Sequence, residues 1–313
     1  MVRDDLKLLF ICASESSYQI WRRVSSDALM GIARHSMSAN VAHYIQSRGC
    51  IQQWVHVLRQ KRARPLESVE RIVSLFCFLQ DSSSCTQQLL DAFENSDGYV
   101  FLAELLLSLE VTLTDEDPDC CDAIRNLILL IGSLTTCGFI ELKPSSPPNG
   151  NQSGFRLPRP MGRGVSVRNI KAFQVLQTVW LRSKSQLITT TILDVILSLY
   201  QQDPANYFIL LPQKTITTIS EAIEEKPDSN VNRFFRIIEW VGLNLGYMLH
   251  DELLPIHAHL KRAPDGCSEE FIQMAFRLLD KLIMQKRMYK EVMFYIITIL
   301  IRLLSDNYQN WVR

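Results

Sequence analysis

Residues 65–76 read PLESVERIVSLF, and this stretch decides the fold class. Proline suits the first position of an α-helix, where the missing N–H would have no partner in any case. The apolar residues after it are separated by 3, 3, 1 and 3 positions, which gathers them on one helix face. They are Leu66, Val69, Ile72, Val73 and Phe76. The stretch therefore predicts an amphipathic helix with one buried face.

The same period recurs along most of the chain. From Phe234 the apolar residues step by 4, 3, 4 and 3 to Met248, and residues 271–282 repeat the pattern. Ser38 is typical of a helix N-cap, and Gly49 of the left-handed position that follows a helix. The pattern predicts an all-α chain of about fifteen helices with short connectors, and no alternating strand pattern competes with it.

Two all-α architectures fit a regular succession of short helices. One is an armadillo- or HEAT-like α-solenoid, in which stacked helix hairpins share a continuous core. The other is a compact helical bundle. The chain has 313 residues, and single cores stop growing at roughly 250–300 residues, so the length favours the solenoid.

One segment interrupts the helical pattern. Residues 143–168 hold five of the twelve prolines and four of the twelve glycines, a density that no helix survives. We therefore expect N-terminal helical repeats over 1–142, a long Pro/Gly/Arg-rich loop over 143–168 and C-terminal helical repeats over 169–313, within one continuous solenoid. Loops of this length inside a domain are usually functional or disordered.

The charge pattern around this loop is uneven. Between Leu142 and Leu193 there is no Asp or Glu but there are eight bases, whereas residues 110–122 carry six acids and no base. One interpretation is a basic segment that docks an acidic lipid, peptide or RNA. The other is a flexible insertion whose arginines keep it soluble or fold it onto the acidic stretch. The candidate partner-binding residues are Arg156, Arg159, Arg163, Arg168 and Lys171.

Composition and motifs exclude several classes of function. The 33 basic and 33 acidic residues balance, so we expect no nucleic-acid partner. None of the eight cysteines forms a CxxC pair, which indicates a reducing compartment without a zinc site or a disulfide framework. The acidic N-terminus is a poor signal peptide, and the longest apolar run, residues 292–304, is too short to span a membrane. No catalytic signature occurs, so we expect neither an enzyme nor a cofactor. The five tryptophans are scattered among the helices and are expected to be packing anchors.

Several strings of residues have a familiar order and spacing. They resemble the N-terminal armadillo-like region of the autophagy-linked FYVE protein family, the WD-repeat and FYVE-domain-containing BEACH proteins, from about residue 4 to about residue 260. The strings are DLKLLF (5–10), ARHSMSANV (33–41), FLQDSS (78–83), GSLTTCG (132–138), ELKP (141–144), VSVRN (165–169), AFQVLQ (172–177) and ANYFIL (205–210).

This resemblance implies a function that the residue patterns alone do not. Members of the family are very large scaffolds with a BEACH domain, WD repeats and a FYVE finger far downstream, and they link aggregated or ubiquitinated cargo and membranes to the autophagy machinery. One branch serves vesicle traffic. The chain lacks the CxxC pairs of a FYVE finger and looks like the N-terminal helical part alone.

The resemblance therefore implies a non-enzymatic scaffold segment in selective autophagy (aggregate clearance, or aggrephagy) or membrane trafficking. Its implied partners are proteins of those two machineries, with membrane association through the domains downstream. The implied location is cytoplasmic, at the periphery of autophagic or endosomal membranes. The family offers no catalytic residue in this region.

Overall fold

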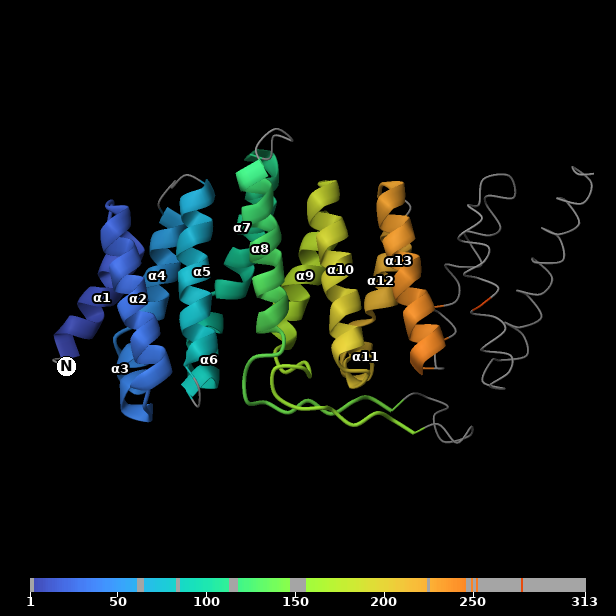
Figure 1. The fold of residues 1–313 in the computed structure, drawn as a ribbon, viewed down its shortest axis with the longest axis horizontal. Helices are drawn as coiled ribbons and strands as arrows, with labels where there is room; N and C mark the ends of the chain where they lie inside the picture. The colour runs from blue at the N-terminus through green and yellow to red at the C-terminus, as the bar shows by residue number, and fades with distance from the viewer. Residues whose placement is uncertain are drawn as a thin grey trace, which may run out of the picture. The chain divides into compact units, whose positions relative to one another are not determined.

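A computed structural model describes residues 3–60, 65–82, 85–112, 118–146, 156–223 and 226–245, together with Leu249, Glu252 and Arg277. Every regular element within these residues is helical, which confirms the predicted all-α class (Figure 1). The α-helices are α1 (Arg3–Glu15), α2 (Gln19–His35), α3 (Ala39–Ser47), α4 (Cys50–Gln60), α5 (Pro65–Asp81), α6 (Thr86–Glu94), α7 (Gly98–Thr112), α8 (Pro118–Leu134), α9 (Ile170–Arg182), α10 (Gln186–Gln202), α11 (Ala205–Leu210), α12 (Thr215–Ala222) and α13 (Asp228–Trp240). A 3₁₀ turn, Leu211–Gln213, follows α11, and a π-helical turn, Val241–Leu245, follows α13.

Several local signals in the sequence are confirmed. The Ser38 hydroxyl accepts a hydrogen bond from the Val41 N–H at 3.4 Å, as an N-cap should. Gly49 has a φ of 62°, the left-handed conformation expected of it. Helix α5 begins at Pro65. The thirteen α-helices belong to the described residues, and the helices expected beyond residue 252 lie outside them.

The chain divides into two compact units. The first comprises residues 1–142 and 162–195, and the second comprises residues 143–161 and 196–313. Helix α10 contributes its beginning to the first unit and its end to the second. The expected boundaries at residues 142 and 168 stay a prediction.

The first unit is built from helix triplets. A short helix, α3 or α6, is followed by two longer ones, α4–α5 or α7–α8, and each helix packs on its counterpart in the next triplet: α3 on α6, α4 on α7 and α5 on α8. The same rows extend to α1 and α2, which pack on α4 and α5, and to α9, which packs on α7 and α8. This row-by-row stacking of three-helix units is the armadillo-like solenoid packing that the sequence predicts.

Aromatic side chains fill the core between the rows. The Phe10 ring meets Trp54 and Phe78 edge to face, with centroids 5.8 and 5.3 Å away, so α1, α4 and α5 share one cluster. Phe93 likewise meets Phe76 at 5.6 Å and Tyr99 at 5.1 Å, which joins α6 to α5 and α7. Edge-to-face pairs stabilise a core beyond the burial of their area.

The tryptophans show where the expected packing fails. Trp54 and Trp180 are fully buried, but 60% of Trp21 is exposed. Its prediction as a packing anchor was wrong, because the buried face of α2 carries Leu29 and Ala33, and Trp21 lies outside that face in solvent.

The second unit packs around the end of α10. Tyr200, Tyr207 and Phe208 form a buried aromatic cluster between α10 and α11. Two hydrogen bonds attach the described ends of segment 143–161 to this unit. The Ser145 N–H donates to the Phe208 carbonyl at 2.9 Å, and the Met161 N–H donates to Asp203 Oδ2 at 2.9 Å. Among the described helices, none combines the length and the apolar character that crossing a membrane requires.

Candidate functional site

Arg163 lies in a tight turn just before α9. Gly162 and Gly164 on either side of it have φ values of 127° and 77°, which favour glycine. The Gly162 N–H donates to the Ser166 hydroxyl at 2.9 Å, and the Ser166 N–H donates back to the Gly162 carbonyl at 3.0 Å. This turn holds the exposed Arg163 guanidinium 4.2 Å from the centre of the Phe139 ring. Stacking of this kind presents the planar guanidinium in a fixed orientation.

Arg168 and Lys171 have carboxylate partners within the first unit. Arg168 is buried, and its Nη2 lies 3.7 Å from Glu141 Oε1. The Lys171 ammonium lies 3.4 Å from Glu94 Oε1. The structure therefore gives both residues an intramolecular role, while their predicted role in partner binding stays a prediction.

Arg156 and Arg159 belong to the second unit and are exposed. Leu157 and Arg159 each precede a proline, which favours an extended backbone there. Within the described part of the chain, no carboxylate forms an ion pair with Arg156, Arg159 or Arg163. The five predicted residues thus divide into Arg168, which is buried, and four exposed bases, of which Arg163 stacks on Phe139 and Lys171 is ion-paired with Glu94.

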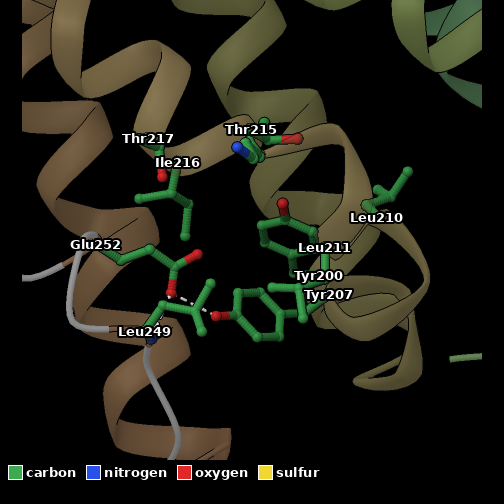
Figure 2. Close-up of a pocket in the computed structure, with 10 residues that line it drawn as sticks. Tyr200, Tyr207, Leu210, Leu211, Thr215, Ile216, Thr217, Leu249 and Glu252 are labelled. Atoms are coloured by element: carbon green, nitrogen blue, oxygen red, sulfur yellow. Dashed lines mark hydrogen bonds between the residues drawn. The ribbon is translucent and has the colours of Figure 1, made fainter. Parts of the chain in front are cut away.

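A small cavity of about 90 Å³ lies in the second unit, at the end of α10 (Figure 2). Its polar lining residues are Tyr200, Tyr207, Lys214, Thr215, Thr217 and the buried Glu252. The Tyr207 hydroxyl donates to Glu252 Oε2, which also accepts the Leu249 N–H at 2.9 Å. The apolar lining residues are Leu210, Leu211, Ile216 and Leu249.

Burial and a nearby negative charge keep the Tyr200 hydroxyl of this cavity protonated and neutral. Burial raises the pKa of Tyr200 well above its usual range, the negative charge of Glu252 raises it further, and a hydroxyl contact with Thr215 opposes the rise. The cavity thus offers hydroxyl groups and a carboxylate, a set suited to hydrogen-bonding a small polar group. Sequence reasoning missed it, because Tyr207 and Glu252 are 45 positions apart and share no motif.

No three His, Cys, Asp or Glu side chains lie close enough to hold a metal ion in the described part of the chain. The rows of helix triplets instead define the first unit as an armadillo-like helical repeat.

No protein-family model matches the sequence. The chain is, however, 30% identical to the human WD repeat- and FYVE domain-containing protein 4 over 260 residues, and 29% identical to the mouse protein over 259 residues.

These matches cover 81% of this chain, so it is related to the WD repeat- and FYVE domain-containing proteins, and the resemblance seen in the sequence is confirmed. The chain spans only 8% of the length of either relative.

Two solved structures have similar helical arrangements. An engineered protein is 11% identical, with a TM-score of 0.39 over 90% of this chain and 97% of its own. A designed armadillo repeat protein is 12% identical, with a TM-score of 0.37 over 88% of this chain and 99% of its own.

Proposed function

We propose that this chain is a non-enzymatic scaffold segment that binds other proteins. The observation that carries the proposal is the stacking of helix triplets in the first unit, since armadillo-like repeats present extended surfaces of aligned helices to their partners. The relationship to the WD repeat- and FYVE domain-containing proteins supports the same reading.

The proposed setting is selective autophagy, in the clearance of aggregates, or vesicle traffic. The partners are proteins of these machineries, and the chain acts in the cytoplasm at the periphery of autophagic or endosomal membranes. Support comes from the relationship to the WD repeat- and FYVE domain-containing proteins. The cysteines of the described residues form no disulfide, which fits a reducing compartment.

Proximity labelling in cells tests this proposal. The full chain and an unrelated armadillo-like protein of similar size are each fused to the labelling enzyme. The proposal expects autophagy or vesicle-traffic proteins to be enriched several-fold on this chain over the control, more strongly when aggregates accumulate. Equal labelling by both baits would reject the setting. A Phe93→Ala variant, which opens the core between α5, α6 and α7, should lose the enrichment.

A second candidate function is electrostatic docking of an acidic partner by the loop, favoured by the exposure of Arg156, Arg159 and Arg163. Replacing all three with Ala should weaken binding to an acidic peptide or to anionic vesicles, and salt should weaken it further. RNA serves as a third arm, in which no binding is expected. The matched control replaces the exposed Lys7, Arg182 and Lys184, which removes the same charge elsewhere. If both variants lose binding equally, the loss reflects the lower net charge of the chain and not a docking site in the loop.

A further inference from the structure

The cavity at the end of α10 is closed on its inner side and reaches solvent on the other. Its inner wall consists of Tyr200, Tyr207, Thr215 and Glu252, none of which is more than 4% exposed. Its opposite side reaches solvent beside Lys214, which is exposed. The volume of about 90 Å³ is well above the roughly 10–15 Å³ that one water needs. A molecule of several non-hydrogen atoms therefore has both an entrance and enough space.

The inner wall gathers oxygen atoms that can accept hydrogen bonds. In Figure 2 the Glu252 carboxylate is turned toward Tyr200, and the Tyr200 hydroxyl toward Thr215. Among the described residues, the buried Thr215 hydroxyl has no hydrogen-bond partner of proper geometry. Leaving a buried hydroxyl unbonded costs stability, so Thr215 indicates that the cavity holds an occupant. A primary ammonium group, with three donors and no acceptor, matches a wall of one carboxylate and two hydroxyls.

The open side of the cavity carries the opposite charge. Lys214 contributes an ammonium group there, and its own backbone has a φ of 48°, which is uncommon for a residue other than glycine. Helix α12 begins directly after it, at Thr215. The first N–H groups of a helix have no acceptor within it and favour a negative charge. The open side therefore suits a carboxylate.

These two charges decide between the classes of small ligand. A simple cation would meet the positive charge of Lys214, and a simple anion would meet the negative charge of Glu252. We propose that the cavity binds a small zwitterion of the α-amino acid class, with its ammonium group toward Glu252 and its carboxylate toward Lys214. The smallest amino acids, such as alanine, match the volume. The site lies within the second unit, so its test does not depend on the scaffold function proposed for the helix rows of the first unit.

Ligand-observed NMR titration of the full chain tests the proposal with three probes. Alanine carries both charges, ethylammonium carries only the cation, and propionate carries only the anion. Alanine is expected to bind in the millimolar range, because so small a molecule has few contacts to make. Each single-charge probe should bind roughly tenfold more weakly, since it loses one charged contact. Binding of either one as tight as that of alanine overturns the zwitterion, and no detectable binding of alanine overturns the site.

Two variants of the inner wall locate the bound alanine. Glu252→Gln keeps an oxygen that can accept from the Tyr207 hydroxyl and the Leu249 N–H, but removes the charge. Thr215→Val keeps the shape of the side chain and removes the hydroxyl. Each should weaken alanine binding by roughly tenfold. Thr215→Val should lose no stability in urea, because its hydroxyl has no hydrogen bond to give up. The matched control is Glu221→Gln, an exposed carboxylate of α12 outside the cavity, which should leave binding unchanged.

A third variant, Lys214→Met, tests the orientation of the ligand. It should weaken the binding of alanine, which loses the partner of its carboxylate, and strengthen the binding of ethylammonium, which no longer meets a like charge. Circular dichroism confirms that every variant is folded. If Glu252→Gln and Thr215→Val bind alanine as tightly as the unaltered chain, the ligand lies elsewhere and the proposal fails. Tighter binding of alanine by Lys214→Met overturns the placement of the carboxylate.

Discussion

Helix α6 and the end of the loop before α9, residues 162–169, hold the same place in chain order, since each precedes two long helices, yet the first unit secures them by different means. Helix α6 inserts Phe93 between Phe76 and Tyr99. The C-terminal end of the loop is instead held by polar atoms: the N–H groups of Arg168 and Asn169 both donate to the Thr135 carbonyl, at 2.8 and 2.9 Å.

The difference teaches what a short first helix contributes to a repeat. Burial of an aromatic ring has little directional demand and constrains the whole helix through packing. Hydrogen bonds constrain only the few atoms they join. We expect stability to depend strongly on α6 and much less on individual loop contacts.

The largest expected effect is that of Phe93→Ala in α6. Phe93 is fully buried, so the substitution removes buried apolar area and leaves a cavity between α5, α6 and α7. The free energy of unfolding should fall by about 3–5 kcal/mol. Urea denaturation followed by circular dichroism measures it. The counterpart on the loop side is Phe139→Ala, which removes a half-buried ring and a cation–π contact, for about 1 kcal/mol. If Phe93→Ala and Phe139→Ala lowered the free energy of unfolding equally, the contrast between α6 and the loop would be wrong.

An intermediate effect is expected for Asn169→Ala. The Asn169 side chain caps α9 by accepting the Ala172 N–H at 3.0 Å, and its Nδ2 donates to the buried Tyr99 hydroxyl at 2.7 Å. Losing both should cost about 1–3 kcal/mol in the same denaturation experiment. Asn169→Ser keeps a capping oxygen and should lose only part of this. If the serine variant is no more stable than the alanine variant, the cap contributes nothing.

A smaller effect is expected for Gly138→Ala, where the chain leaves α8. Gly138 has a φ of 111°, which alanine rarely adopts, and an added Cβ would lie 2.7 Å from Gln87 Oε1. Gln87 Oε1 accepts the Phe139 N–H at 3.1 Å and its Nε2 donates to Asp91 Oδ1 at 2.8 Å, so the expected loss of about 1 kcal/mol combines backbone strain with a shift of this side chain. The thermal midpoint should fall by a few degrees. Adding Gln87→Ala relieves the crowding but not the strain, so full recovery in that double variant would contradict the explanation.

The smallest effect concerns Cys137, at the same junction. Burial raises the pKa of its thiol from the ordinary 9.0 to about 11, and the charge of Asp81 adds to this. The folded state therefore keeps the proton while the unfolded state loses it, so this contribution to stability is complete below pH 9 and falls away as pH rises from 9 to 11. Alkylation of native Cys137, followed by mass spectrometry, should still accelerate with pH above 9. A plateau near pH 9 in the folded protein would show an ordinary thiol.

The helices could be predicted from the sequence because their signals are local. Ser38, Gly49 and Pro65 act through the backbone within a few residues, so no tertiary knowledge is needed. The exposure of Trp21 could not be predicted from the sequence. Apolar residues occur on both faces of α2, and their periodicity does not tell which face packs on another helix. The sequence likewise shows the charge of Arg168 but not its pairing with Glu141, which depends on how the chain returns to α8.

The cavity in the second unit was beyond prediction for the same reason. Tyr200, Tyr207 and Thr215 come from three successive helices, and only packing brings them to Glu252. Of the five bases assigned to partner binding, the sequence could not separate the buried Arg168 from the four exposed ones.

Asp203 has a consequence for how this chain can diversify. One of its carboxylate oxygens accepts the Met161 N–H, and the other accepts the Ala205 N–H at the start of α11. Ser145 is bound at the opposite end of the same segment, to the Phe208 carbonyl. With both ends anchored, the entropy of closing the chain between Ser145 and Met161 grows only slowly with the length of that stretch. The two anchoring hydrogen bonds therefore fix where the chain leaves and re-enters this unit, whatever the length of the stretch between them.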